Sequence, residues 1–254
     1  QGPTAARAKA LAGAGGIAWW TDRGASRPLY EEALAIEREL GDPARLAEAL
    51  YNQAFAVAGE HDLESAARLL HESLGLFRQV GDESSVARVL VTLVVQDAMA
   101  GAWDRVVARI EEGAAIWRRL GDRLNLAFAL IWLAFAYGRA GRREDARSTA
   151  LEALGLFREA DNATGIALAF LDLAFLLTWE GRHEDAIRMA GVSQAHRDQA
   201  GGGPTPGFGG MLEGDPVAEA RAHLTEDAAQ RAWQEGLTMS LPEAVARAQG
   251  DTVG

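Results

Sequence analysis

The chain has 254 residues, of which 48% are hydrophobic, and carries a formal net charge of −11 at pH 7. This acidic balance argues against nucleic acid as a direct partner, because binding to phosphates depends on clustered Lys and Arg. The absence of cysteine excludes disulfides, thiolate zinc sites and cysteine nucleophiles.

The longest apolar runs fall short of the ~18 residues of a membrane span, and no signal peptide is recognisable. The five histidines are scattered without metal-site spacing, so we expect no metal and no cofactor. The absence of cysteine suits a reducing compartment, so the expected location is cytoplasmic. The chain begins at Gln1 rather than Met, which favours a piece cut from a longer polypeptide over a processed product.

The N-terminal segment predicts two helices, from about Thr4 to Trp20 and from Leu29 to Leu40, joined by the turn TDRGAS. The stretch GAGG within the first helix resembles a phosphate-binding loop. No strand precedes it and no Lys-Ser or Lys-Thr follows it, so close helix packing explains these glycines better.

From there a unit of 40 residues recurs. A helix that stops and reverses favours Gly just past its end, where φ is positive, and the next helix needs a side-chain oxygen at its N-cap. Both requirements are met at four steps of 40, by the dipeptides Gly41-Asp42, Gly81-Asp82, Gly121-Asp122 and Asp161-Asn162. Each unit therefore predicts two helices, about Arg123 to Ala140 and Arg143 to Glu159 in the central one.

Stepping by 40 residues also identifies the apolar positions of each first helix. One position is shared by Leu50, Leu90, Leu130 and Phe170. Three residues later, Leu93, Leu133 and Leu173 share a second position. Apolar sites three and four residues apart predict antiparallel helix pairs stacked side by side.

This pattern resembles the tetratricopeptide repeat on five residues, Leu133, Ala134, Tyr137, Gly141 and Ala146. The period of 40 exceeds the usual ~34 residues, which favours a variety with long helices. Armadillo and HEAT arrays remain an alternative. The resemblance implies an all-α fold, a right-handed α-solenoid of five helix pairs.

After the fifth pair, the segment GGGPTPGFGG predicts a flexible linker. Three short helices are predicted beyond it. The last of them begins with a capping box formed by Ser240 and Glu243. The predicted domains are therefore repeats 1–200, a linker 201–215 and a helical cap 216–254. The cap is expected to dock on the array.

The amino-acid sequence of this tail is similar to the segment that closes the repeat domains of large bacterial signalling ATPases, including LuxR-type transcriptional regulators and some multidomain adenylate cyclases. The residues that carry the similarity are Trp233, Glu235, Gly236, Leu241, Glu243 and Ala244, and Pro242 departs from it. The chain has no Walker motif, cyclase signature or DNA-binding helix pair. The resemblance thus implies a non-catalytic sensor or scaffold part, whose effector domains lie elsewhere.

In tetratricopeptide arrays the first helix of each pair lines a concave groove, and the resemblance implies which residues face it here. The groove is expected to be apolar and aromatic, with few charged groups. Its candidate residues are Tyr51, Asn52, Phe55, Arg88, Val95, Phe128, Trp132, Phe135, Arg139, Asp172, Phe175 and Trp179.

The expected guest is a protein or peptide, or a small apolar effector. Two alternatives remain open: some of these aromatic residues belong to the core, or the C-terminal helices fold back into the groove. A self-association scaffold of the same regulator is the competing function.

Overall fold

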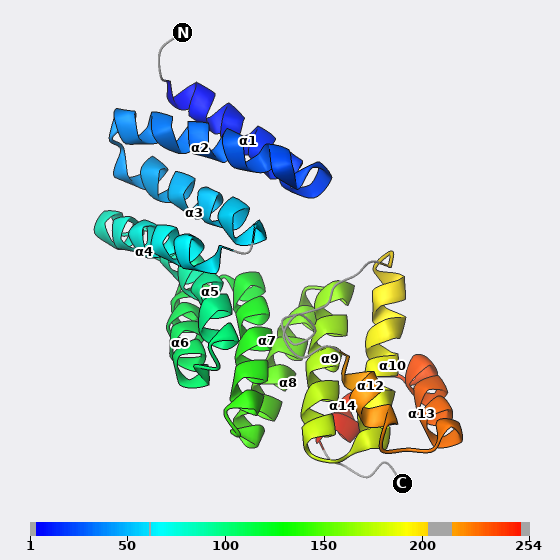
Figure 1. The fold of residues 1–254 in the computed structure, drawn as a ribbon. Coiled ribbons are helices and arrows are strands. Elements are labelled where there is room, and N and C mark those ends of the chain that lie inside the picture. The colour runs from blue at the N-terminus through cyan, green and yellow to red at the C-terminus, as the bar shows by residue number, and fades with distance from the viewer. Residues whose placement is uncertain (1–3, 61, 203–214, 250–254) are drawn as a thin grey trace. The chain divides into compact units, whose positions relative to one another are not determined.

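The computed structural model of the protein describes residues 4–60, 62–202 and 215–249. Within these residues 86% of the chain is helical and there is no strand, which confirms the all-α prediction. Figure 1 shows the helices in chain order: α1 (Ala5–Thr21), α2 (Arg23–Leu40), α3 (Pro43–Gly59), α4 (Leu63–Val80), α5 (Glu83–Met99), α6 (Trp103–Leu120), α7 (Arg123–Arg139), α8 (Arg143–Glu159), α9 (Ala163–Trp179), α10 (His183–Gln199), α12 (Pro216–Arg221), α13 (Glu226–Thr238) and α14 (Leu241–Gln249).

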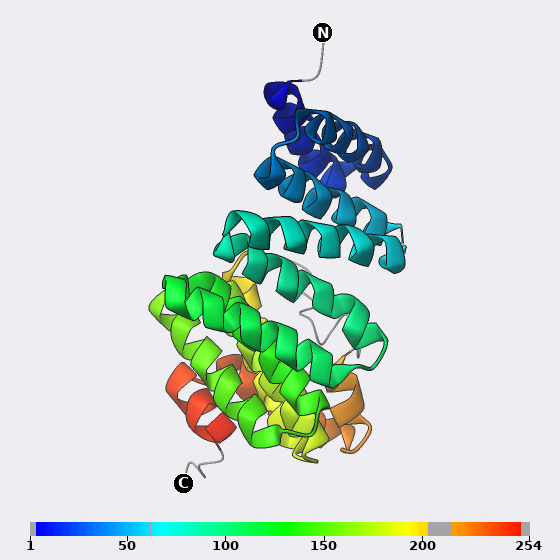
Figure 2. The same ribbon diagram turned by 90° about the vertical axis from the view of Figure 1, so that its left-hand side faces the viewer.

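The chain divides into two compact units, residues 1–100 and 101–254. In the first unit α1 packs on α2, α2 on α3, α3 on α4 and α4 on α5. The same succession runs from α6 to α10 in the second unit, so each unit is a stack of helices in chain order (Figure 2). No helix in the described ranges is both long and apolar enough to cross a membrane.

The turns between pairs have the backbone that the sequence predicts. Positive φ angles of 71°, 75°, 72° and 49° occur at Gly41, Gly81, Gly121 and Asp161. One residue later, each cap side chain accepts a hydrogen bond from the backbone N–H three residues ahead, at 2.8 to 3.1 Å; the caps are Asp42, Asp82, Asp122 and Asn162. These bonds satisfy amides of the first turn that have no partner within the helix.

The second helix, α2, begins at Arg23, six residues before the predicted start at Leu29. Pro28 lies inside it and removes one backbone donor. The Ser26 hydroxyl donates a hydrogen bond of 3.0 Å to the Gly15 carbonyl and ties this early turn to α1. The predicted TDRGAS turn is therefore shorter than expected.

The register of 40 residues describes the core. The first-helix position shared by Leu50, Leu90, Leu130 and Phe170 is 0 to 2% exposed in each of these four helix pairs. A buried serine hydrogen bond recurs in the same register: the Ser73 hydroxyl donates to the Ala47 carbonyl, and the Ser193 hydroxyl donates to the Ala167 carbonyl, each at 2.7 Å. These two bonds lie 120 residues apart, three repeats along the chain.

Beyond the repeats, α12, α13 and α14 pack against α10 in the second unit (Figure 1). The backbones of α10 and α13 come so close that a Cβ added to Gly236 would overlap the Arg188 carbonyl oxygen. The C-terminal helices are therefore docked, as expected. Most of the predicted linker, residues 203–214, lies outside the described residues.

Candidate functional site

In the first unit, the predicted groove residues of α3 and α5 form one connected group. Arg88 on α5 makes two hydrogen bonds to the Glu48 carboxylate on α3, and its guanidinium carbon lies 4.1 Å from the centre of the Tyr51 ring. The Tyr51 hydroxyl is 3.2 Å from the Thr92 hydroxyl oxygen. Burial raises the pKa of Tyr51, so this hydroxyl stays protonated at neutral pH.

Phe55 stands at the edge of this group with 38% of its surface exposed. Its ring makes edge contacts with Tyr51, at 5.0 Å between centroids, and with Trp19 of α1, at 6.5 Å. Phe55 also borders a hollow of about 110 Å³ between α3, α4 and α5. The other residues lining this hollow are Ala54, Ala58, Leu63, Ala66, Ala67, Leu70, Thr92, Leu93, Val95 and Gln96.

A second, wider hollow of about 420 Å³ lies between α1, α2 and α3. Five alanines from α1 and α2 and one from α3 make its floor. Asn52 is on its edge, together with Lys9 and the ion pair of Arg45 with Glu37. Of the predicted groove residues in the first unit, Asn52 thus lines the wider hollow, and Phe55 and Val95 line the smaller one. Arg88 lines neither, and neither does Tyr51, which is only 8% exposed.

In the second unit, several predicted groove residues are buried. Phe135 is 2% exposed and Phe175 is 1% exposed, and their ring centroids are 5.5 Å apart. Phe135 also contacts Trp103 and Trp179, at 6.0 and 5.4 Å. These two phenylalanines lie in the core, because α7 and α9 pack directly on each other and bury more of their circumference than a groove-lining helix does.

Other residues of the second unit remain partly accessible. Phe128 is half-buried against Phe157, with centroids 5.0 Å apart, and Trp132 is also half-buried. The exposed Arg139 guanidinium lies 5.3 Å from Trp103 and 5.9 Å from Trp179, so it covers the edge of the aromatic cluster.

Asp172, predicted to orient a guest, is 5% exposed. Its Oδ2 atom has no hydrogen-bond partner among the described residues. Burial raises the pKa of this carboxyl well above its usual value, because removal from water disfavours the charged form. Asp172 is thus an enclosed carboxyl in the structure and does not lie on the surface, where the prediction placed it.

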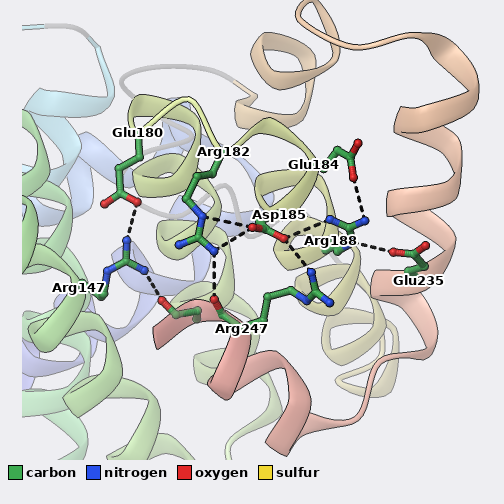
Figure 3. Close-up of polar contacts among 9 residues, drawn as sticks. Arg147, Glu180, Arg182, Glu184, Asp185, Arg188, Glu235 and Arg247 are labelled. Carbon is green, nitrogen blue, oxygen red and sulfur yellow. Dashed lines mark hydrogen bonds and ion pairs between the residues drawn. The ribbon is translucent and has the colours of Figure 1, made fainter. Parts of the chain in front are cut away.

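A cluster that the sequence did not indicate holds the C-terminal helices in place (Figure 3). Its centre is Asp185 on α10, which is contacted by three arginines: Arg182 at 2.8 Å, Arg188 at 3.1 Å and Arg247 of α14 at 3.1 Å. Arg188 also bonds Glu235 of α13 at 2.6 Å. We call Arg147, Glu180, Arg182, Glu184, Asp185, Arg188, Glu235 and Arg247 the docking cluster.

The docking cluster also provides hydrogen-bond donors for the backbone carbonyls at the C-terminal end of α14. Arg147 of α8 donates to the Ala248 carbonyl and pairs with Glu180, and Arg182 donates to the Arg247 carbonyl at 3.3 Å. Cations suit this position, because the last carbonyls of a helix carry partial negative charge and have no partner within the helix.

The charge of Asp185 is stabilised by its neighbours. Partial burial by itself raises the pKa of Asp185, but hydrogen bonds from Arg182 and Arg247 and the nearby positive charges hold it below its usual value. The only hint in the sequence is the recurrence of Arg and Asp three residues apart, at Arg142 and Asp145 and again at Arg182 and Asp185.

Among the described residues, no group of three or more His, Cys, Asp or Glu side chains is placed to hold a metal ion. Neither a protein-family model nor a curated protein matches the chain.

Solved structures do match it. A crystal structure of a Podosopora anserina putative kinesin light chain with nearly identical TPR-like repeats has a TM-score of 0.64 at 14% identity, covering 78% of this chain and 97% of that one. BtubC (BKLC) from P. vanneervenii has a TM-score of 0.65 at 19% identity, covering 80% and 84%. At these identities the similarity concerns the fold, and the prediction of a tetratricopeptide-like solenoid is confirmed.

Proposed function

We propose that this chain is the partner-binding part of a bacterial signalling or transcriptional regulator, and that a protein partner inserts an apolar side chain beside Phe55. The observation that carries the proposal is the hollow between α3, α4 and α5, where a partly exposed aromatic ring borders an aliphatic cavity. Exposed apolar surface of this kind is typical of binding sites.

The size of this hollow favours a protein over a small molecule. At about 110 Å³ it is well below the ~300 Å³ at which small-molecule sites begin. It suits one aliphatic or aromatic side chain of a partner, which is how interface anchors bind. The neighbouring pair of Arg88 and Glu48 is already satisfied internally, so it supplies a polar edge without an uncompensated charge.

Two features support the proposal that the chain is the partner-binding part of a regulator. Tetratricopeptide-like arrays generally serve as protein-interaction scaffolds. The tail around Trp233 and Gly236 resembles the closing segment of repeat domains in LuxR-type regulators and multidomain adenylate cyclases. On this proposal the chain works in the cytoplasm, catalyses no reaction and does not itself bind DNA.

The proposal can be tested by selection from a phage-displayed library of amphipathic helical peptides. We expect peptides enriched on the wild-type chain to lose binding to Phe55→Glu. The matched control, Leu124→Glu on α7, changes another exposed apolar residue in the second unit and should retain binding. Enrichment that is the same on Phe55→Glu would refute the proposed surface.

Self-association through the same surface is the competing function. Light scattering at tens of micromolar distinguishes the two, because a partner-binding module remains a monomer under these conditions. A dimer that dissociates in Phe55→Glu would favour the scaffold.

A further inference from the structure

The first helix, α1, has two apolar faces, and the residues that the structure describes cover only one of them. Ala8, Gly15 and Ala18 are buried in the first unit. On another side of the helix, Ala10, Gly13, Ala14 and Ile17 are all exposed, and Ile17 is 70% exposed. Spacings of three, four and seven residues place these four side chains on one stripe, which we call the outer face of α1.

The repeat register shows that this exposure is unusual. Forty-residue steps from Ile17 lead to Val57, Asp97, Tyr137 and Leu177, which are only 0 to 8% exposed. The same steps from Ala10 lead to Leu50, Leu90, Leu130 and Phe170, which are 0 to 2% exposed. In four successive pairs, the positions equivalent to the outer face are core.

In those pairs the second helix of the preceding pair supplies the cover. The Tyr137 hydroxyl on α7 donates a hydrogen bond of 2.5 Å to Glu111 on α6. Leu50 of α3 belongs to one buried cluster with Leu34 of α2. The outer face of α1 is therefore the continuation of an interface that the molecule already uses between successive pairs.

We propose that the outer face of α1 is the docking site for an amphipathic helix of a partner protein, which packs on α1 as α2 packs on α3. This helix extends the array at its N-terminal end. The proposal concerns a surface different from the one around Phe55, so its failure leaves the proposed function intact.

The residues of the outer face define the chemistry of this helix. Where the later pairs have Leu or Phe, α1 has Ala10, and Gly13 has open space around the position of a Cβ. Small residues on one side require bulky residues on the other for close packing. The partner helix thus carries Leu, Phe or Trp at positions i, i+4 and i+7.

A peptide from the chain itself provides a probe. Helix α4, Leu63–Val80, packs on α5 and carries Leu70, Leu74 and Phe77 at this spacing. We expect the acetylated, amidated and fluorescently labelled α4 peptide to bind the full chain. Ile17→Glu should weaken that binding at least tenfold, whereas Leu124→Glu should not. Because Ile17 is exposed, neither variant should alter the melting temperature of the unbound chain.

A fusion removes the requirement that a free peptide folds. Residues 63–82 placed directly before Pro3 preserve the period of 40, since Pro3 holds the register position of Glu83. We expect this fusion to melt at a higher temperature than the unfused chain, and Ile17→Glu to abolish the gain.

Two results would overturn the proposal. The first is the combination of two negative results: the α4 peptide does not bind the full chain, and the fusion melts no higher than the unfused chain. The second is an unfused chain that dimerises and is dissociated by Ile17→Glu, because a second copy would then be the occupant.

Discussion

Asp185 on α10 accepts a hydrogen bond of 3.1 Å from Arg247 on α14, although the two residues are 62 positions apart in the chain. With Arg182 and Arg188 on its other sides, this carboxylate is the common partner of three cations in the docking cluster. Replacing it leaves those cations without their shared counter-charge.

Asp185→Asn is therefore expected to destabilise the docked C-terminal helices. Loss of a partly buried partner of several charges costs about 2 kcal/mol, which is less than the ~3–5 kcal/mol for one partner of a fully buried pair. The expected result is a melting temperature about 5 °C lower, with faster amide exchange in α14. Asp145→Asn is the matched control: Asp145 holds the same register position and pairs with Arg142 at the surface, so it should cost less than ~1 kcal/mol. Equal effects of both variants would contradict the role of Asp185.

The same carboxylate gives the chain a defined response to acid. The folded state lowers the pKa of Asp185, so its contribution to stability is complete above the unfolded pKa of about 4 and is lost as the pH falls through the lower, folded value. Thermal melts of the wild type and Asp185→Asn should differ at pH 7 and converge towards pH 3. A difference that grows on acidification would have the wrong sign for this mechanism.

Close contact between α10 and α13 predicts that Gly236 tolerates no side chain. A Cβ there would overlap the Arg188 carbonyl oxygen, which belongs to the backbone and cannot move aside easily. We expect Gly236→Ala to lower the free energy of unfolding by about 2 kcal/mol through overpacking. In the control, Gly155→Ala, the added methyl group meets nothing within 4 Å and should stabilise α8 by up to ~1 kcal/mol.

The burial of the aromatic residues predicts two different mutational effects. Phe135→Ala removes a ring that is 2% exposed and should cost about 3 kcal/mol or more in urea unfolding. Phe55→Ala removes a ring that is 38% exposed and should cost less than half as much. If the two variants were equally destabilised, the distinction between a core cluster in the second unit and a surface in the first would fail.

The local features of this fold could be predicted from the sequence because they repeat. Gly81 and Asp82 specify a turn and a cap by their own chemistry, and a step of 40 residues finds the buried positions. The start of α2 could not be predicted, because Ser26 is held by a carbonyl of another helix.

The candidate site was less predictable for the same physical reason. A register shows which side of a helix a residue occupies, but not how closely the next helix approaches. Phe135 and Phe175 are on the predicted side and are nevertheless enclosed by each other and by Trp179. The contact of Asp185 with Arg247 joins a repeat to a segment without the repeat, so no periodicity could indicate it.

The central claim, that the first unit binds a protein partner beside Phe55, is tested most directly by a comparison of dissociation constants. A peptide selected on the wild-type chain would be titrated by fluorescence anisotropy against the wild type, Phe55→Ala and Leu124→Ala. We predict binding at least tenfold weaker for Phe55→Ala and unchanged for Leu124→Ala, since Phe55 borders the hollow between α3, α4 and α5 and Leu124 does not. Equal dissociation constants for the wild type and Phe55→Ala would contradict the claim.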